Sequence, residues 1–337
     1  MTIEFFILLI CIAAVVAAPR IGILAMLRRR RSKNVRIRVE DALKHIHDSE
    51  YHGRRATWGE VVHALGLSTA EGLELVTTLR SMNLVTAESG DIRLTDEGRM
   101  YALRVIRVHR LWERYLADET SVAETDWHTE AEKLEHKLSA ADADALAAQL
   151  GNPQYDPHGD PIPSAAGELP AQQSQSLVSL HTGDVASIVH LEDEPPEIYA
   201  QLVAQGLYPG MQLQVTEVSD QRIRFEAEGE ACVLAPLFAE NVSVRLLTDA
   251  ERATEPFVQL SSLKMGEEAT VVAISRACRG QQRRRLMDFG IVPGTHIRAS
   301  LQSLTGDPMA YEIRSATVAL RKQHADQIFI RDVRAGE

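Results

Sequence analysis

Residues 109–113 read HRLWE, and residues 128–136 read HTEAEKLEH. Positions three or four apart lie on the same face of a helix, so each segment brings its histidine and glutamate side chains together. The two helices thus offer three imidazoles and three carboxylates, from His109, Glu113, His128, Glu132, Glu135 and His136. Nitrogen and oxygen ligands without a thiolate suit Mn²⁺ or Fe²⁺ best, with Zn²⁺, Co²⁺ and Ni²⁺ as competitors.

The alternative is that these charged residues are solvated on amphipathic helices, which is the usual meaning of a single His/Glu pair. Here apolar residues lie between the pairs, namely Leu111, Trp112, Tyr115, Ala131 and Leu134. Apolar side chains between two ligand pairs favour helices that pack and bring the pairs to a common point. We therefore expect a metal centre.

Both segments resemble the metal-binding and dimerisation domain of the diphtheria-toxin-repressor and manganese-regulator family. So does the motif DPHGDPIP at residues 156–163, and the resemblance extends over residues 35–163. It implies a homodimer with two metal sites. The first site is implied at His109, Glu113 and His128. The second is implied at Glu132, Glu135 and His136, with Asp41 from the first helix.

Two positions indicate which metal this resemblance implies. Iron-type members carry cysteine at the position of Glu132, whereas manganese-type members carry glutamate, so Glu132 together with Asp41 favours manganese. Manganese-type members also carry glutamate one turn after the position of Asp41. This chain has Lys44 there, which departs from a binuclear manganese arrangement.

The composition is that of an ordinary globular protein of two or three domains, with 337 residues, 45% hydrophobic and 25% charged. The net charge of −11 argues against a general nucleic-acid binder, but residues 20–55 are rich in arginine and lysine and allow a local basic face. The cysteines Cys11, Cys232 and Cys278 are far apart and form no metal-ligand pair. This usage indicates a reducing compartment.

Residues 1–31 predict a membrane anchor followed by a basic stop. Residues 5–27 are mostly apolar and, as a helix, reach about 34 Å, enough to cross a hydrocarbon core of about 30 Å. The basic run RRRRSK at 28–33 places the following domains in the cytoplasm of a single-pass protein of the cell membrane. A cleavable signal peptide is the alternative, but it would begin with basic residues, and the first charged residue here is Glu4.

Residues 33–98 predict a winged helix-turn-helix. After a first amphipathic helix, Thr57 caps a short second helix and Ser68 caps a third. Leu73 is expected on the buried face of this third helix. Two alternating segments within residues 84–94 predict a two-stranded wing.

The third helix of this motif is the candidate DNA-reading helix, and the candidate contacts are Ser68, Thr69, Glu74 and Thr78. In family members that read DNA, the position of Glu74 is typically glutamine and that of Thr78 is often basic. Carboxylates at Glu71 and Glu74 repel DNA phosphates, although glutamate can accept a hydrogen bond from cytosine. The alternative is a winged helix that serves only as a packing module.

An internal repeat occupies the C-terminal half of the chain. LVAQGLYPG at residues 202–210 matches LMDFGIVPG at residues 286–294. Each copy predicts a small antiparallel barrel around one short helix. The shared signature resembles the FeoA-type, Src-homology-3-like domain, over residues 177–247 and 257–333.

The two barrels carry charged segments with more than one interpretation. In repressors of the family the barrel can lend acidic ligands to the first metal site, so Glu194 and Glu197 are possible additional ligands, with a solvated acidic loop as the alternative. In the second barrel, Arg279 and residues 283–285 form a basic face before the predicted helix. That face could meet acidic lipid, nucleic acid or another domain, and solvent exposure is the default expectation.

We therefore expect a mainly α N-terminal half followed by two small all-β FeoA-type barrels. The α half comprises the transmembrane helix, the winged helix and the helical metal-binding and dimerisation domain over residues 99–163. Residues 152–176 predict an ordered Pro-rich turn and then a flexible linker, and this linker, residues 164–176, precedes the barrels.

The leading functional hypothesis is a membrane-tethered, homodimeric transcriptional regulator in which Mn²⁺ or Fe²⁺ fixes the angle between two winged helices on DNA. The alternative is a cytosolic metal-sensing and interaction module of a metal-transport system, without DNA binding. A hydrolytic metalloenzyme is disfavoured, because no nucleophile or oxyanion arrangement accompanies the His/Glu cluster.

Overall fold

The computed structural model describes residues 23–335 apart from 89, 172, 228–229, 249–257, 276–277, 293 and 315. The chain divides into two compact units. The first contains residues up to His109 together with 134–144 and 163–168. The second contains residues 110–133, 145–162 and 169 onward, so α5 (Asp96–Glu119), α6 (Trp127–Glu135) and α7 (Ala140–Gln149) have residues in both units.

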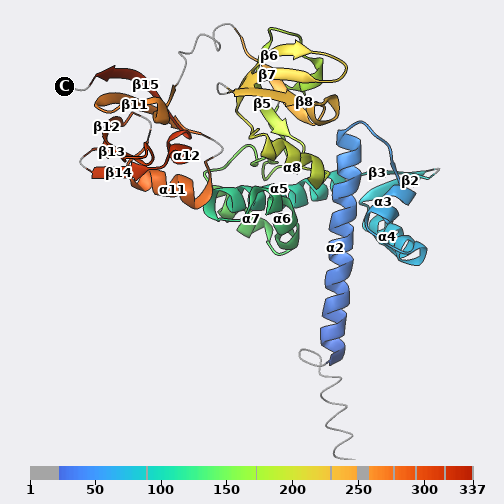
Figure 1. The fold of residues 1–337 in the computed structure, drawn as a ribbon. Coiled ribbons are helices and arrows are strands. Elements are labelled where there is room, and N and C mark those ends of the chain that lie inside the picture. The colour runs from blue at the N-terminus through green and yellow to red at the C-terminus, as the bar shows by residue number, and fades with distance from the viewer. Residues whose placement is uncertain are drawn as a thin grey trace, which may run out of the picture. The chain divides into compact units, whose positions relative to one another are not determined.

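The first unit is a helix-turn-helix followed by a two-stranded hairpin (Figure 1). The strands form an antiparallel sheet in the order β1-β3-β2, with Ala56 opposite Ile92 and Val85 opposite Leu94. Besides the start of α5, its elements are α2 (Ile23–Tyr51), β1 (Ala56–Thr57), α3 (Trp58–Ala64), α4 (Thr69–Ser81), β2 (Val85–Glu88) and β3 (Asp91–Leu94).

Capping boxes set where the two short helices of this unit begin. Thr57 Oγ1 accepts a hydrogen bond from the backbone N–H of Glu60, and the Glu60 carboxylate accepts one from the backbone N–H of Thr57. Ser68 and Glu71 repeat the arrangement at α4. Each box satisfies backbone N–H groups that a helix N-terminus leaves without partners.

The core of the first unit confirms the amphipathic first helix but not the orientation expected for α4. Leu43 and Ile46 of α2 pack with Leu79 of α4 in one buried cluster. Leu73, expected on the buried face, is 65% exposed, so this prediction is wrong. The buried face of α4 is made by Gly72, Leu75 and Leu79, which follow the i, i+3, i+7 spacing and leave Leu73 on a neighbouring face.

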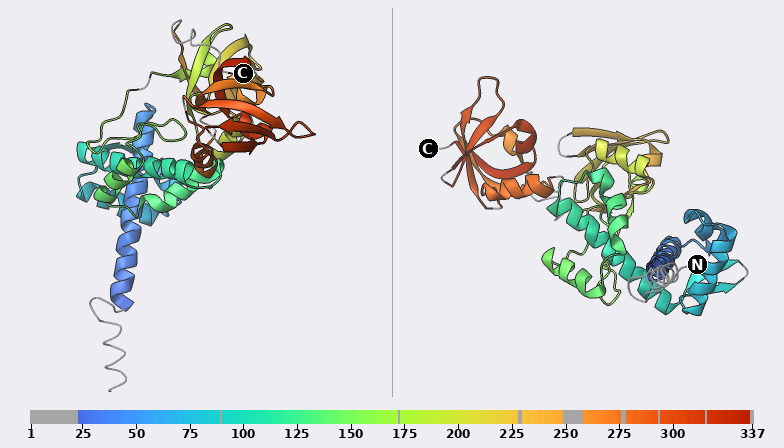
Figure 2. Two further views of the ribbon diagram at one scale, coloured as in Figure 1. Left: turned by 90° about the vertical axis from the view of Figure 1, so that its left-hand side faces the viewer. Right: turned by 90° about the horizontal axis from the view of Figure 1, so that it is seen from below.

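The second unit contains two barrels with the same strand order (Figures 1 and 2). The first barrel has the order β4-β9-β5-β6-β7-β8 and the second has β10-β15-β11-β12-β13-β14. Equivalent strands therefore pair in both copies, as the internal repeat requires. Each barrel is a strongly curved antiparallel sheet with one longer helix, α8 or α11, beside it.

The first barrel contains β4 (Gln175–Ser176), the 3₁₀ helix η2 (Leu177–Ser179), β5 (Val185–Leu191), α8 (Pro196–Ala204), β6 (Gln212–Val218), β7 (Ile223–Ala227), β8 (Glu230–Leu234), α9 (Pro236–Ala239) and β9 (Val242–Leu246). The second contains β10 (Val258–Gln259), η3 (Leu260–Ser262), β11 (Glu267–Ile274), α11 (Gly280–Asp288), β12 (His296–Gln302), β13 (Met309–Ile313), β14 (Ala316–Leu320), α12 (Lys322–Ala325) and β15 (Ile328–Ala335). The 3₁₀ helix η1 (Glu124–Asp126) precedes α6.

The fold class is confirmed in its broad form, because a mainly helical N-terminal half is followed by a β-rich C-terminal region. Most of the expected membrane span over residues 5–27 lies outside the described residues. Among the described helices, none has the length and apolar character needed to cross a bilayer. The domain boundaries expected from the sequence stay predictions.

Candidate metal centres

The first unit contains a cluster of metal-ligating side chains, which we call the His136 centre. Asp41 comes from α2, Glu135 ends α6, and His136 follows directly. The three offer ligand atoms that lie within 4.8 Å of one another. His136 Nε2 is 3.1 Å from Asp41 Oδ1, and His136 Nδ1 is 2.6 Å from Glu40 Oε2. The Glu40 carboxylate thus orients the imidazole, as an outer partner of a metal-binding histidine does.

Lys44 lies in this centre as a built-in cation. Its ammonium Nζ is 3.2 Å from Glu135 Oε2 and 3.2 Å from His109 Nδ1. His109 Nδ1 is itself 2.5 Å from the same carboxylate oxygen of Glu135. One oxygen of a buried carboxylate therefore faces an ammonium group and an imidazole, and the other faces His136 at 3.5 Å.

The charges of the His136 centre shift the pKa values of its members. Burial by itself lowers the pKa of His136, but hydrogen bonds to the Asp41 and Glu40 carboxylates outweigh it and raise the pKa to about 9. Burial raises the pKa of Glu135, yet the hydrogen bond with His109 and the charge of Lys44 outweigh it and lower the pKa to about 2. The low pKa keeps Glu135 ionised, which is the form that binds a cation.

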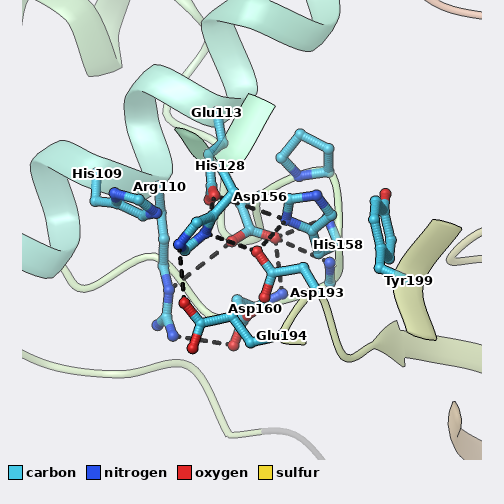
Figure 3. A network of polar contacts seen from close by, with 12 residues as sticks. His109, Arg110, Glu113, His128, Asp156, His158, Asp160, Asp193, Glu194 and Tyr199 are labelled. Carbon is cyan, nitrogen blue, oxygen red and sulfur yellow. Dashed lines mark hydrogen bonds and ion pairs between the residues drawn. The ribbon is translucent and has the colours of Figure 1, made fainter. Parts of the chain in front are cut away.

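The second unit contains another cluster, the Glu113 centre, made of Glu113, His128, Asp156, His158 and Asp193 (Figure 3). Glu113 lies on α5, His128 on α6, Asp156 and His158 on the loop after α7, and Asp193 on the loop after β5. Glu113, Asp156 and His158 are buried, and their ligand atoms lie within 4.8 Å of one another. Helices, a loop and a barrel thus meet at this centre.

Short distances connect the side chains of the Glu113 centre. His128 Nδ1 is 3.2 Å from Glu113 Oε1 and 2.8 Å from Asp193 Oδ2. His158 Nδ1 is 3.5 Å from the same oxygen of Asp193 and 3.8 Å from Glu113 Oε1. The carboxylates outweigh the effect of burial and raise the pKa of His128 well above its usual range.

Several buried atoms of the Glu113 centre show that it fits a divalent cation. Among the described residues, both ring nitrogens of His158 and Asp156 Oδ2 are buried without a hydrogen-bond partner. Asp156 Oδ1, in contrast, accepts three backbone N–H bonds at 2.9 Å, which fix the carboxylate. Burial together with the charge of Asp160 raises the pKa of Asp156 well above its usual range. A bound cation would supply the missing partner and keep the carboxylate ionised.

Contacts outside the ligands hold the Asp156–Asp160 loop in place. Arg110 Nη2 is 2.9 Å from Asp160 Oδ1, and Arg110 Nη1 donates to the Pro161 carbonyl at 2.6 Å. The first barrel contacts the same loop, because Leu191 N–H donates to the His158 carbonyl at 2.9 Å. A Cβ on Gly159, whose φ is +100°, would lie 2.0 Å from the Val189 carbonyl oxygen. This close approach requires glycine.

The structure brings together most of the ligands expected from the sequence. One of them, Glu132, lies at a different centre from the one expected. His109 lies on α5 one turn before Glu113 and contacts Glu135. Glu132 was expected with Glu135 and His136, but its side chain is 53% exposed and its Oε1 is 3.7 Å from His128 Nε2. Glu132 projects from α6 three residues before Glu135, and this places it beside the Glu113 centre.

The acidic loop of the first barrel supplies one candidate ligand that the sequence named, Glu194, and one that it did not, Asp193. Glu194 Oε1 is 3.1 Å from His128 Nε2, although the side chain is 65% exposed. Glu197 is exposed in the first turn of α8, and the contacts of the described residues include none between it and the centre. Asp193 is the acidic residue that faces both histidines. The motif containing Asp156 and His158 was a signal that these side chains belong to the centre.

The candidate DNA contacts lie on the N-terminus and exposed side of α4. Ser68 and Glu71 are engaged in the capping box, and Glu71 Oε1 is also 2.7 Å from Arg38 Nη2 of α2. The backbone and side-chain hydrogen bonds from Ser68 lower the pKa of Glu71 to about 2. Thr69 and Glu74 are exposed, and Thr78 Oγ1 donates to the Glu74 carbonyl at 2.8 Å.

Comparison with known families connects these centres to a group of regulators. Residues 95–164 match the family described as "Iron dependent repressor, metal binding and dimerisation domain". This part of the chain is therefore similar to the metal-binding and dimerisation domain of iron-dependent repressors. Residues 258–332 match the FeoA domain family, which accounts for the second barrel.

Individual relatives cover different parts of the chain. The iron-dependent repressor IdeR of Mycobacterium bovis is 31% identical over 148 residues, which are 42% of this chain and 64% of that protein. A "Probable metal transport system membrane protein" of Chlamydia trachomatis is 38% identical over 80 residues, which are 24% of this chain and 18% of that protein. The chain thus spans less than two thirds of either relative.

A solved structure titled "Manganese-dependent transcriptional repressor complex with manganese" is 29% identical, with a TM-score of 0.58. The similarity covers 62% of this chain and 100% of that chain. The repressor relatives are regulators that depend on iron or manganese, and they are not enzymes. The names of these relatives thus specify iron and manganese as their metals.

Proposed function

We propose that the chain is a membrane-tethered, homodimeric transcriptional regulator that binds Mn²⁺ or Fe²⁺ and, in response, DNA. The observation that carries this proposal is the composition of the His136 centre. Asp41 belongs to α2, which packs in the core of the winged helix, whereas Glu135 and His136 belong to the end of α6. A cation held by all three joins these elements and selects one arrangement of the winged helix.

The donor atoms support the choice of metal. Both centres offer imidazole nitrogens and carboxylate oxygens, and the described ligand groups contain no thiolate. Such sites suit Mn²⁺ and Fe²⁺. When bound, the cation supplies positive charge that offsets the buried carboxylates, while Glu40 and Arg110 orient the ligands around it.

The membrane tether is supported by the sequence before and within α2. Residues 5–27 are mostly apolar and residues 28–33 are basic, which suits a single-pass protein of the cell membrane with cytoplasmic C-terminal domains. α2 begins at Ile23 and continues through Asp41 to Tyr51. The basic run and the ligand Asp41 therefore share one helix. A tether of this kind would confine DNA reading to loci near the membrane.

A second candidate is a metal-sensing and interaction module of a metal-transport system that does not read DNA. Two observations favour it: the exposed carboxylate of Glu74 on α4, and the similarity to the chlamydial protein named as part of a metal transport system. A carboxylate on the reading helix opposes binding to the phosphate-rich groove.

A DNA titration with a charge-neutral variant separates the two candidates. The full-length chain is titrated against DNA from upstream of its own operon, with and without Mn²⁺, at two salt concentrations. The regulator is expected to bind only with Mn²⁺ and to weaken steeply with salt. Glu74→Gln should strengthen binding by about 1 kcal/mol or change its sequence preference. Glu226→Gln, an exposed position on β7, serves as the matched control.

The same titration can contradict the proposal. If Mn²⁺ binds but neither the wild type nor Glu74→Gln binds DNA at the lower salt concentration, the regulator is excluded. The second candidate then remains, in which the winged helix serves only for packing.

A further inference from the structure

The arginine side chains of the basic face of the second barrel contact two different parts of the chain. Arg283 Nη1 donates to the carbonyls of Ile274 and Ser275 in its own barrel, at 3.3 and 3.2 Å. The Arg285 guanidinium lies 5.6 Å from the ring centroid of Phe289, also in its own barrel. Arg279 and Arg284 instead contact the helical part of the second unit. This face therefore meets another part of the same chain.

Arg279 contacts the residue that precedes each histidine of the Glu113 centre. Its Nη2 donates to the Pro157 carbonyl at 3.2 Å, and Pro157 directly precedes His158. Its guanidinium carbon lies 5.0 Å from the ring centroid of Trp127, which directly precedes His128. The Trp127 and His158 rings also contact each other, with centroids 5.9 Å apart.

The packing around Arg279 is close and specific. Gly280 has a φ of +54°, and a Cβ there would lie 2.2 Å from the Thr120 carbonyl oxygen at the end of α5. Arg284 forms an ion pair with Glu119 on the same helix. Burying a guanidinium group costs free energy unless partners replace its water. The Trp127 ring and the Pro157 carbonyl provide such partners here.

We propose that Arg279 is a positioning residue for the Glu113 centre, and that docking of the second barrel and metal binding at this centre stabilise each other. Docking fixes the backbone from which His128 and His158 project. Metal binding in turn fixes the loop and the Trp127 ring that receive Arg279. This inference rests on the proposed function in one respect, because it requires the Glu113 centre to bind Mn²⁺ or Fe²⁺.

The coupling between docking of the second barrel and metal binding should change the Mn²⁺ affinity of the Glu113 centre. Reciprocal couplings of this kind are typically about 5–150-fold, and we expect a loss of about tenfold in Mn²⁺ affinity when the barrel is released. Calorimetric titration of the full-length chain in a His136→Ala background isolates the Glu113 centre. Arg279→Ala removes the contact, and Gly280→Ala blocks the approach to Thr120.

Two matched controls lie in the same barrel. Arg285→Ala removes an arginine of the same helix that contacts its own barrel. Gly266→Ala strains a glycine with a φ of +84° but meets nothing within 4 Å. Both controls should keep the affinity of the parent protein. If Gly280→Ala unfolds the barrel, Arg279→Ala decides the test.

Hydrogen exchange gives a second readout, because it reports on the docking of the second barrel directly, whereas metal affinity does not. Mn²⁺ should slow backbone exchange across α11 in the parent protein and not in Arg279→Ala. The proposal is overturned if Arg279→Ala binds Mn²⁺ as tightly as the parent protein, or if Mn²⁺ does not change hydrogen exchange in α11 of the parent protein. Either result leaves the proposed function intact. A chain without Mn²⁺ affinity at either centre overturns both.

Discussion

His158 is a buried residue whose ring has no hydrogen bond in the part of the chain that the structure describes. Its side chain is 1% exposed, and both ring nitrogens are without a hydrogen-bond partner. Each unsatisfied buried polar group costs about 1–3 kcal/mol. A cation bound to a ring nitrogen would remove part of that cost, so the Glu113 centre is best explained as a site prepared for a metal.

Replacing His158 with phenylalanine should separate metal binding from folding. The new ring keeps its packing against Trp127 and Tyr199 but removes the unsatisfied nitrogens. We expect the metal-free chain to be as stable as the wild type or more so, by up to about 2 kcal/mol. Mn²⁺ affinity of the Glu113 centre should fall at least about tenfold. Urea unfolding with a chelator and Mn²⁺ titration measure the two effects.

The exposed His181 of the first barrel provides the control for this substitution. His181→Phe should change neither the free energy of unfolding nor the Mn²⁺ affinity. A His158→Phe chain that binds Mn²⁺ as tightly as the wild type would show that this histidine is not a ligand.

Lys44 adds a positive charge beside the carboxylate that the His136 centre offers to a metal. Its Nζ is 3.2 Å from Glu135 Oε2. A divalent cation about 6 Å from an ammonium group is opposed by about 1.4 kcal/mol even at the dielectric constant of water. Lys44 therefore lowers the affinity of this centre for metal while it holds Glu135 in place.

Lys44→Gln should raise the Mn²⁺ affinity of the His136 centre by roughly tenfold or more. The substitution removes the opposing charge and keeps a hydrogen-bond donor for Glu135. Lys133→Gln is the matched control, because Lys133 pairs with Glu130 on an exposed face. Titration in a His158→Phe background measures this centre alone. A weaker affinity in Lys44→Gln would mean that Lys44 acts mainly by positioning Glu135.

At the level of elements, α3 and α4 allow stability and DNA binding to be separated. Both begin at capping boxes of the same type, at Thr57 and Ser68. Thr57→Ala and Ser68→Ala should each lower the free energy of unfolding by about 1 kcal/mol. Only Ser68→Ala should also weaken DNA binding, because Ser68 lies at the start of the candidate reading helix. Equal DNA affinities in the two variants would remove Ser68 from the interface.

Local patterns predicted the elements of this chain well. The capping residues Thr57 and Ser68 mark the starts of α3 and α4, and the repeated Pro-Gly signature marks two barrels with one strand order. These features depend on neighbouring residues, which a sequence displays directly. Leu73 is the counterexample. Several apolar positions on α4 were compatible with more than one buried face, and tertiary packing selected the face of Leu75 and Leu79.

The ligand sets could be predicted only in part. The i, i+4 spacing brought out Glu113, His128 and His136, because each lies on a helix with a regular period or directly after one. Asp193 and His158 lie on loops, and their approach to Glu113 depends on how the first barrel packs. No periodicity encodes such a contact. Glu132, in contrast, lies near His128 because the two residues are one turn apart on α6, so the helix period accounts for this contact.

At the scale of the whole molecule, the proposed function requires that metal binding and DNA binding be linked through α2. The net charge of −11 opposes DNA, so a regulator built on this chain needs an arrangement in which the basic residues of α2 and the winged helix are presented together. The His136 centre offers a way to select that arrangement, because Asp41 lies on α2. A cation that binds one arrangement better shifts the population toward it.

The most direct test is to measure the Mn²⁺ affinity of the chain with and without DNA from upstream of its own operon, which the proposed function expects it to bind. If metal selects the DNA-binding arrangement, DNA must tighten Mn²⁺ binding by the same factor by which Mn²⁺ tightens DNA binding. We expect a factor of roughly ten or more, lost in Asp41→Asn and kept in Asp220→Asn, an exposed position of the first barrel. Equal Mn²⁺ affinities with and without DNA would contradict the account.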